Sequence, residues 1–176
     1  MTTLSVKPVF GGRVIQVSVE TVQLPNGNVA DLEIIHHPGG AAVVAIDEQR
    51  QVCLLRQFRH AANGWVWELP AGKIDNREPP LQTAQRELEE EAGALAANWE
   101  SLGDVLSSPG VFTEIVHLFL ATDLRMVESK NEAHEVLEVH WKPLDEVLRM
   151  AVSGELRDGK SLAAIFRAAA RHRASG

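Results

Sequence analysis

Three glutamates, Glu87, Glu90 and Glu91, are spaced so that a helix would bring their carboxylates together. At about 100° per residue they gather on one face of the helix, while Glu89 points away from them. Like charges at these spacings repel, and the macrodipole disfavours anions near the C-terminal end of a helix. Bound cations would remove this conflict. Carboxylates suit hard ions such as Mg²⁺, which can bridge phosphate oxygens and activate a water molecule.

The helix that carries these glutamates is expected over residues 79–92. A proline is tolerated in its first turn, and Gly93 is suited to the position just after its end. The apolar positions expected to pack on a sheet are Leu81, Ala84, Leu88 and Ala92. A solvated acidic face is the alternative to a metal site. The helix alone leaves the two interpretations equal.

The elements around this helix predict an α/β (α+β) fold. Residues 14–22 and 29–36 form an expected hairpin around Asn26-Gly27. We expect this hairpin to make an N-terminal antiparallel β-hairpin layer over residues 1–38, and a main domain to span residues 39–176. Further strands are expected near residues 41–46, 51–57, 65–69, 99–106, 116–122 and 135–141, and helices near residues 144–153 and 161–172. This order favours an α/β/α sandwich with a mixed sheet.

The composition is that of an ordinary soluble protein, with 176 residues, 45% of them hydrophobic. The net charge of -7 argues against nonspecific binding of nucleic acids or anionic membranes. The single cysteine, Cys53, excludes an internal disulfide and is expected to be a buried apolar residue. The first ten residues do not resemble a signal peptide, and no run approaches the ~18 apolar residues of a membrane span. We therefore expect a cytoplasmic protein.

The wider pattern around the glutamates resembles the Nudix box, GX5EX7REUXEEXGU, in which U is a bulky apolar residue. The matching residues are Gly72, Glu78, Arg86, Glu87, Glu90, Glu91 and Gly93. Every fixed position matches, and the only departure is the small Ala94 at the last U. Such a long pattern, in its expected strand–loop–helix context, is far more specific than a lone glycine motif.

The resemblance implies the α/β/α sandwich of the Nudix fold and metal-dependent hydrolysis of a pyrophosphate bond. The implied cofactor is Mg²⁺, with Mn²⁺ as the alternative. The implied metal ligands are the carbonyl of Ala71 and the carboxylates of Glu87, Glu90, Glu91 and Glu135. The implied catalytic group consists of Arg86, Glu90, Glu91, Glu132 and Glu135. Within it, Arg86 would pair with a carboxylate such as Glu78 and hold the loop against the helix.

The catalytic base stays open. Members of one branch of the Nudix family often carry several acids on the loop before the final strand, which corresponds here to residues 128–135. By resemblance, Glu135 matches a carboxylate near the metals, while the position proposed for the base holds Ala133. Glu132, His134, Glu135 or a box glutamate would then activate the water.

The segment Ser108-Pro109-Gly110 resembles the proline signature of the ADP-ribose pyrophosphatase branch, because Pro109 lies fifteen positions after Ala94. Residues 57–59, 67–72 and 138–141 resemble the same branch. The expected partner is a small-molecule nucleoside diphosphate sugar, foremost ADP-ribose, which would give AMP and ribose 5-phosphate. By the same resemblance the N-terminal hairpin, whose exposed edge needs cover, would form a homodimer.

The residues expected at the substrate are Arg59, Trp67, Glu68, Ser108, Pro109 and Gly110. Arg59 would contact the diphosphate or form a surface ion pair, and the residue types leave these alternatives equal. Trp65 and Trp67 would offer a face to adenine, although we expect at least one of them in the core. Pro109-Gly110 would present backbone to the terminal ribose or serve only as a turn. His36 and His37 are expected to be structural.

Two other functions compete with this one. The first is hydrolysis of a different nucleoside diphosphate sugar, such as GDP-mannose or ADP-glucose, because the pocket rather than the box selects the substrate. The second is a non-catalytic Nudix protein that binds a nucleotide as a sensor. The complete box favours an enzyme.

Overall fold

The computed structural model describes residues 2–129 and 136–174, which form two compact units. The first unit comprises residues 1–39 and 106–115, and the second comprises residues 40–105 and 116–176. The sequence did not predict that residues 106–115 belong with the N-terminal layer. They join it because the backbone amide of Ile35 donates to Val111 at 2.7 Å, and Thr113 donates to Ile35 at 2.9 Å.

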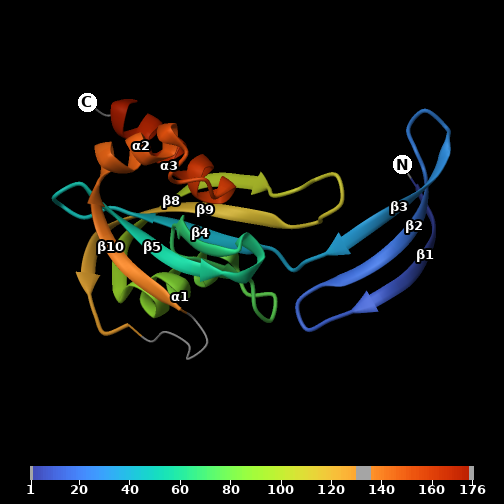
Figure 1. Ribbon diagram of the computed structural model, residues 1–176, viewed down its shortest axis with the longest axis horizontal. Helices are drawn as coiled ribbons and strands as arrows, with labels where there is room; N and C mark the ends of the chain where they lie inside the picture. The colour runs from blue at the N-terminus through green and yellow to red at the C-terminus, as the bar shows by residue number, and fades with distance from the viewer. Residues whose placement is uncertain (1, 130–135, 175–176) are drawn as a thin grey trace. The chain divides into compact units, whose positions relative to one another are not determined.

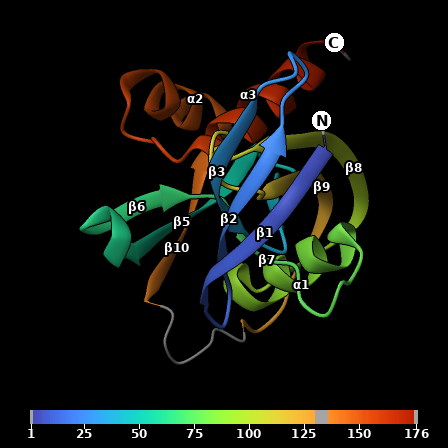
Figure 2. The same cartoon turned by 90° about the vertical axis from the view of Figure 1, so that its right-hand side faces the viewer.

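The first unit contains a three-stranded antiparallel sheet. It consists of β1 (Thr2–Gly11), β2 (Gln16–Gln23) and β3 (Val29–His36), with β2 in the middle (Figure 2). The predicted hairpin is present, and the Asn26-Gly27 turn places Gly27 at a φ of +86°. Strand β1 was not predicted. It holds Pro8, which is tolerated because β1 is an edge strand.

The second unit contains two sheets. The four-stranded sheet has the order β7-β4-β9-β8, with β4 and β9 parallel, and the three-stranded antiparallel sheet has the order β10-β5-β6. The strands are β4 (Gly40–Ala45), β5 (Gln51–Arg59), β6 (Gly64–Glu68), β7 (Ala71–Lys73), β8 (Ala94–Leu106), β9 (Ile115–Met126) and β10 (Leu137–Pro143), and a short 3-10 helix, η1 (His60–Ala62), follows β5. Parallel pairing of β4 with β9 makes the sheet mixed, as predicted.

In the described part of the second unit, three helices cover the two faces of this arrangement: α1 (Pro80–Ala92), α2 (Leu144–Ser153) and α3 (Gly159–Ala174). All six residues of β4 are buried, and alternate residues point to opposite faces. Ala41, Val43 and Ala45 pack in one cluster with apolar residues of α1. Ala42 and Val44 pack in another with residues of α2 and α3. Figure 1 shows α1 on one side of the strands and α2 and α3 on the other, which confirms the predicted sandwich.

Helix α1 holds the glutamates at fixed positions beside the sheet. Ala84, Leu88 and Ala92 are buried, as the apolar spacing predicts. The helix ends at Gly93, whose φ of +61° suits glycine and whose amide reaches the carbonyls of Leu88 and Glu89. A Cβ at Gly93 would lie 2.7 Å from the carbonyl oxygen of Val127, so this position needs a glycine on two grounds.

The ends of the other helices follow local rules. Helix α2 spans the predicted residues, whereas α3 begins two residues before the predicted Ser161. Asp158 explains this earlier start, because its carboxylate accepts the backbone amide of Ser161 at 3.1 Å and so caps the helix. None of the helices in residues 2–129 and 136–174 has the length and apolarity needed to cross a membrane.

Candidate active site

Glu91 anchors the end of α1 to the start of β7. Its side chain is only 2% exposed, and its Oε2 accepts a hydrogen bond from the backbone amide of Ala71 at 2.8 Å. An ionised carboxylate this deeply buried needs partners, since an isolated one would be costly. The expected ligand from Ala71 was its carbonyl oxygen. The amide of the same residue contacts Glu91 directly.

The carboxylate of Glu87 lies where a side chain at Gly72 would have to be. A Cβ added at Gly72 would lie 1.9 Å from Oε1 and 2.2 Å from Cδ of Glu87. The absence of a side chain at Gly72 is therefore what lets the Glu87 carboxylate lie against the backbone of β7. Consecutive residues of β7 thus contact two different box glutamates, because Ala71 binds Glu91.

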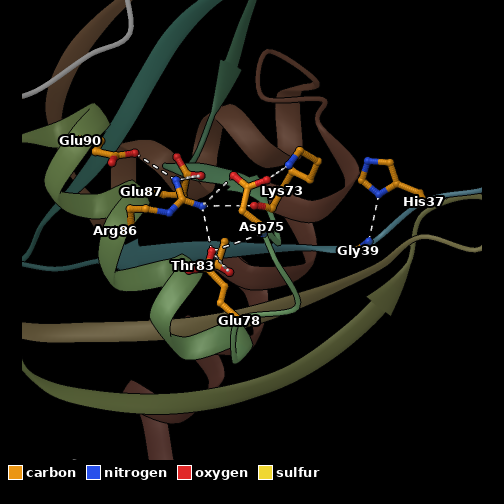
Figure 3. A network of polar contacts seen from close by, with 9 residues as sticks. All are labelled: His37, Gly39, Lys73, Asp75, Glu78, Thr83, Arg86, Glu87 and Glu90. Atoms are coloured by element: carbon orange, nitrogen blue, oxygen red, sulfur yellow. Dashed lines mark hydrogen bonds and ion pairs between the residues drawn. The ribbon is translucent and has the colours of Figure 1, made fainter. Parts of the chain in front are cut away.

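Arg86 lies at the centre of a polar network (Figure 3). Its Nη1 donates to Oε1 of Glu87 at 2.7 Å and to Oε2 of Glu90 at 3.0 Å. Its Nη2 donates to Oε1 of Glu78 at 3.0 Å and to the carbonyl oxygen of Lys73 at 3.2 Å. The predicted pair with Glu78 is present, and it joins the loop to the helix. Burial lowers the pKa of Arg86, but its carboxylate partners outweigh burial and raise that pKa.

Glu78 organises the loop between β7 and α1. The same Oε1 that binds Arg86 accepts the hydroxyl of Thr83 at 2.8 Å, while Lys73 forms an ion pair with Asp75. Burial raises the pKa of Glu78, but the hydrogen bonds from Thr83 and Arg86 outweigh it and lower that pKa. Figure 3 shows the loop residues and the helix residues meeting at Arg86. The loop is therefore held by charge-assisted bonds.

The donor set at this place fits a hard divalent cation in type, because every candidate is an oxygen. Glu87 and Glu91 reach adjacent residues of β7, which brings two carboxylates to the same short strand. No three acidic, histidine or cysteine side chains within residues 2–129 and 136–174 form a group that could hold a metal ion. Mg²⁺ usually takes only one or two carboxylates and completes its sphere with water and phosphate. The predicted ligand Glu135 lies outside the described residues, as does Glu132.

Cys53 of β5 packs in the same core cluster as Ala84, Leu88 and Ala92 of α1, the helix that carries the glutamates. Burial and then the negative charge of Glu91 raise the pKa of its thiol to about 12. The thiol is fully buried and stays protonated at neutral pH, which makes it an inert packing residue, as the sequence predicts.

Arg59 forms the ion pair that was one of its two expected roles. Its Nε and Nη2 donate to the two carboxylate oxygens of Glu68 at 2.8 and 2.9 Å. The hydrogen bond from Arg59 to Glu68 raises the pKa of Arg59, burial opposes this, and the charge of Glu91 adds to the increase. Arg59 is therefore within electrostatic reach of a box glutamate. This pairing occupies one edge of the guanidinium and leaves Nη1 for another acceptor.

The comparisons with known proteins decide the family. The family model of the NUDIX domain matches residues 36–165. The chain belongs to the Nudix family. It is 39% identical to an ADP-ribose pyrophosphatase of Bacillus subtilis over 93% of this chain and 89% of that protein. It is 34% identical to an ADP-ribose pyrophosphatase of Mycobacterium tuberculosis over 93% of this chain and 81% of that protein.

The fold has a close counterpart among solved structures. A crystal structure described as an ADP compounds hydrolase superposes with a TM-score of 0.85, covering 99% of this chain and 95% of that one. The sequence identity is 22%, so this likeness shows the fold. The sequence-based assignment to the Nudix superfamily and its ADP-ribose pyrophosphatase branch is confirmed by the family match and the relatives.

The aromatic candidates of this Nudix protein differ in their surroundings. Trp67 packs against the main core cluster, with its ring centroid 4.9 Å from that of His140 and 5.4 Å from Nζ of Lys142. Trp65 is 41% exposed and makes an edge contact with Phe58 at 6.1 Å. The expectation that at least one tryptophan is in the core therefore applies to Trp67. A role for Trp67 at adenine stays a prediction.

The remaining candidates lie in the first unit. Ser108, Pro109 and Gly110 are exposed and form a turn in which the amide of Phe112 donates to the carbonyl of Ser108 at 2.9 Å. Their contact with substrate stays a prediction. The two expected structural histidines have structural partners: His36 lies 2.9 Å from the hydroxyl of Ser18, and Nδ1 of His37 accepts the amide of Gly39 at 3.1 Å.

Three residues of α3 and the loop before it were missed by the sequence analysis. Lys160 and Ser161 reach the segment that leads into the Nudix loop, because Oγ of Ser161 accepts the amide of Leu69 at 2.9 Å and Lys160 binds Glu68. Asp158 in turn binds both Lys160 and Ser161. Asp158 three positions before Ser161 is a helix-capping spacing that could have been recognised. The contacts with Glu68 and Leu69 span 92 residues and leave no local signal.

Proposed function

We propose that this chain hydrolyses the pyrophosphate bond of ADP-ribose to give AMP and ribose 5-phosphate. The observation that carries the proposal is the junction of α1 with β7. There Glu87 fills the space beside Gly72, and Glu91 accepts a hydrogen bond from the backbone amide of Ala71. The similarity to two proteins named ADP-ribose pyrophosphatase, over 93% of this chain, supports the substrate.

In the proposed reaction the oxygen of a water molecule attacks one phosphorus of the diphosphate. The bond from that phosphorus to the bridging oxygen breaks, the bridging oxygen leaves with the other phosphate, and the proton of the water passes to a base. A divalent cation, which we propose to be Mg²⁺ with Mn²⁺ as the alternative, would offset the developing negative charge and lower the pKa of the water. The groups proposed to hold it are the carbonyl oxygen of Ala71 and the carboxylates of Glu87, Glu90, Glu91 and Glu135.

The protein side chains have separate proposed roles. Arg86 fixes Glu87 and Glu90 relative to the loop, and we assign it a positioning role. Arg59 offers Nη1 to an oxygen of the diphosphate, since its other edge is held by Glu68. The proposed proton acceptors are a glutamate of the Nudix box, foremost Glu90 or Glu91, and the loop residues Glu132, His134 and Glu135.

We also propose that the protein forms a homodimer through the first unit. All ten residues of β1 are exposed, although alternate residues of a strand point to opposite faces. Their large apolar side chains are Leu4, Val6, Val9 and Phe10, each more than half exposed. An exposed edge strand with apolar side chains is a template for pairing with another chain. A second copy of this sheet is an occupant with matching chemistry.

A substrate panel tests the activity. The purified protein is incubated with Mg²⁺ and ADP-ribose, ADP-glucose, GDP-mannose, NADH or diadenosine polyphosphates, and the products are separated by ion-exchange chromatography. We expect ADP-ribose to be cleaved fastest, with AMP as a product. Faster cleavage of GDP-mannose or ADP-glucose would keep the chemistry and replace the substrate. Tight nucleotide binding without turnover in Mg²⁺ or Mn²⁺ would favour a non-catalytic sensor instead.

A further inference from the structure

A buried carboxylate on β6 binds two cations at once. Glu68 is 4% exposed, and its Oε1 and Oε2 accept the paired hydrogen bonds from Arg59. Its Oε2 also accepts a hydrogen bond from Nζ of Lys160 at 2.6 Å. Burial raises the pKa of Glu68, but Arg59 and Lys160 together outweigh burial and hold that pKa at about 2. Glu68 is therefore ionised near neutral pH.

Lys160 is held in place by the start of its own helix. Its Nζ binds Oδ2 of Asp158 at 2.9 Å, and the same Oδ2 accepts the amide of Ser161 at 3.1 Å and its hydroxyl at 2.5 Å. Burial lowers the pKa of Lys160, but the charges of Asp158 and Glu68 outweigh burial and raise it. Lys160 thus places a fixed positive charge beside Glu68.

This cluster borders a cavity of about 440 Å³ in the second unit. Its charged lining residues are Arg59, Glu68, Arg157 and Asp158. With Lys160 included, the positive charges of Arg59, Arg157 and Lys160 exceed the negative charges of Glu68 and Asp158 by one. That excess stands out in a chain of net charge -7. Removal of the charge of Lys160 would bring the local balance to zero.

Arg59 is only partly committed to Glu68. Its side chain is 42% exposed, and none of the described residues accepts a hydrogen bond from its Nη1. Were Arg59 the sole cation beside Glu68, the negative charge of Glu68 would cancel the positive potential of the Arg59 guanidinium. Because Lys160 offsets part of that negative charge, the potential around Arg59 stays positive and favours an anion.

We propose that Lys160 is a positioning residue for substrate binding: it shares the charge of Glu68, and so keeps the Arg59 guanidinium oriented and available for the diphosphate. The inference rests on the proposed function, in which Arg59 contacts the diphosphate. Lys160 itself touches no substrate. A purely structural role for Lys160 would instead stabilise the start of α3 and leave substrate binding unchanged.

Steady-state kinetics with ADP-ribose separate these roles. For Lys160→Met, which removes the charge and keeps the length of the side chain, we expect KM to rise about five- to tenfold while kcat stays within about twofold. Lys160→Arg restores the charge and should return KM to within about twofold of the wild type. Arg171→Met is the matched control, because it removes a cation of the same helix that pairs with Glu100. It should leave both constants unchanged.

A double-mutant cycle ties the effect to Glu68. In a Glu68→Gln background the charge that Lys160 shares is gone, so Lys160→Met should change KM by less than about twofold. The proposal is overturned if Lys160→Met lowers Tm with KM unchanged, or if it raises KM equally with and without the charge of Glu68. Lys160→Gln replaces Lys160→Met should the latter not fold.

Failure of the proposed function gives a different result. If the wild-type protein does not hydrolyse ADP-ribose, the substrate assignment falls before any variant is compared. The role of Lys160 is then decided by the Kd of ADP-ribose from isothermal titration calorimetry, which needs no turnover. A higher Kd for Lys160→Met than for the wild type supports the proposal. Equal Kd values, or no binding by either protein, overturn it.

Discussion

The substitution Gly72→Ala adds a single methyl group at the junction between β7 and α1 and so tests whether that junction positions Glu87. The new Cβ would lie 1.9 Å from Oε1 of Glu87, whereas ordinary van der Waals contact begins near 3.4 Å. The obstacle is the end of a flexible side chain, so the carboxylate can move away by about 1.5 Å while the backbone stays in place. We therefore expect the fold to survive and the position of Glu87 to change.

The size of the effect follows from that displacement. A misplacement of about 1 Å in a catalytic site can cost roughly 100-fold in rate, so kcat/KM for ADP-ribose should fall about 100-fold or more. The hydrogen bond from Arg86 to Glu87 would be weakened, which should lower the free energy of unfolding by about 1–2 kcal/mol. For a chain of this length that corresponds to a fall in Tm of roughly 2–8 °C.

The assay pairs kinetics with thermal unfolding followed by circular dichroism. Gly11→Ala is a matched control, because a Cβ there has no atom within 4 Å and the backbone is not left-handed. It should change neither kcat/KM nor Tm. The reasoning is refuted if Gly72→Ala keeps kcat/KM within about fivefold of the wild type, since Glu87 would then not be needed where it lies.

Three further predictions concern other parts of the molecule. Glu91→Gln should fold, because the amide oxygen can still accept a hydrogen bond, but kcat should fall about 100-fold or more, while Glu89→Gln on the same helix keeps most of it; a near-normal kcat for Glu91→Gln would remove the metal assignment. Because the pKa of Glu68 is lowered to about 2 from 4.5, its contribution to stability is complete above pH 4.5 and disappears as the pH falls toward 2. Urea unfolding should show this acid sensitivity, which is worth about 2 kcal/mol between pH 7 and pH 3 and should be smaller in Glu68→Gln. Light scattering at micromolar concentration should give a dimer, and Phe10→Lys should shift it toward monomer; a monomeric wild type would contradict the proposed interface.

The sequence predicted the second unit well because its elements follow local rules. The apolar spacing of α1 and the glycine after it set both the buried face and the end of that helix. Strand β4 reads as a buried run because it is covered on both faces. Strand β1 gave no such signal: every one of its residues is exposed, and Pro8 argues against a strand until one knows that it lies at an edge.

The candidate site was predictable only where its residues follow one another in the chain. The pair of Arg86 with Glu78 could be expected because both belong to one short motif. The contact of Lys160 with Glu68 could not be predicted, because Lys160 lies 92 residues away and a lone lysine at the start of a helix suggests a solvated side chain. Arg59 shows the consequence. Its residue type allowed a phosphate contact or an ion pair, and the structure shows that the ion pair occupies one edge of the guanidinium and leaves the other open. The ion pair with Glu68 and a contact with phosphate are compatible for Arg59 provided that Glu68 has a second cation. The decisive measurement is therefore the change in KM when the charge of Lys160 is removed, and not the effect of an Arg59 variant alone.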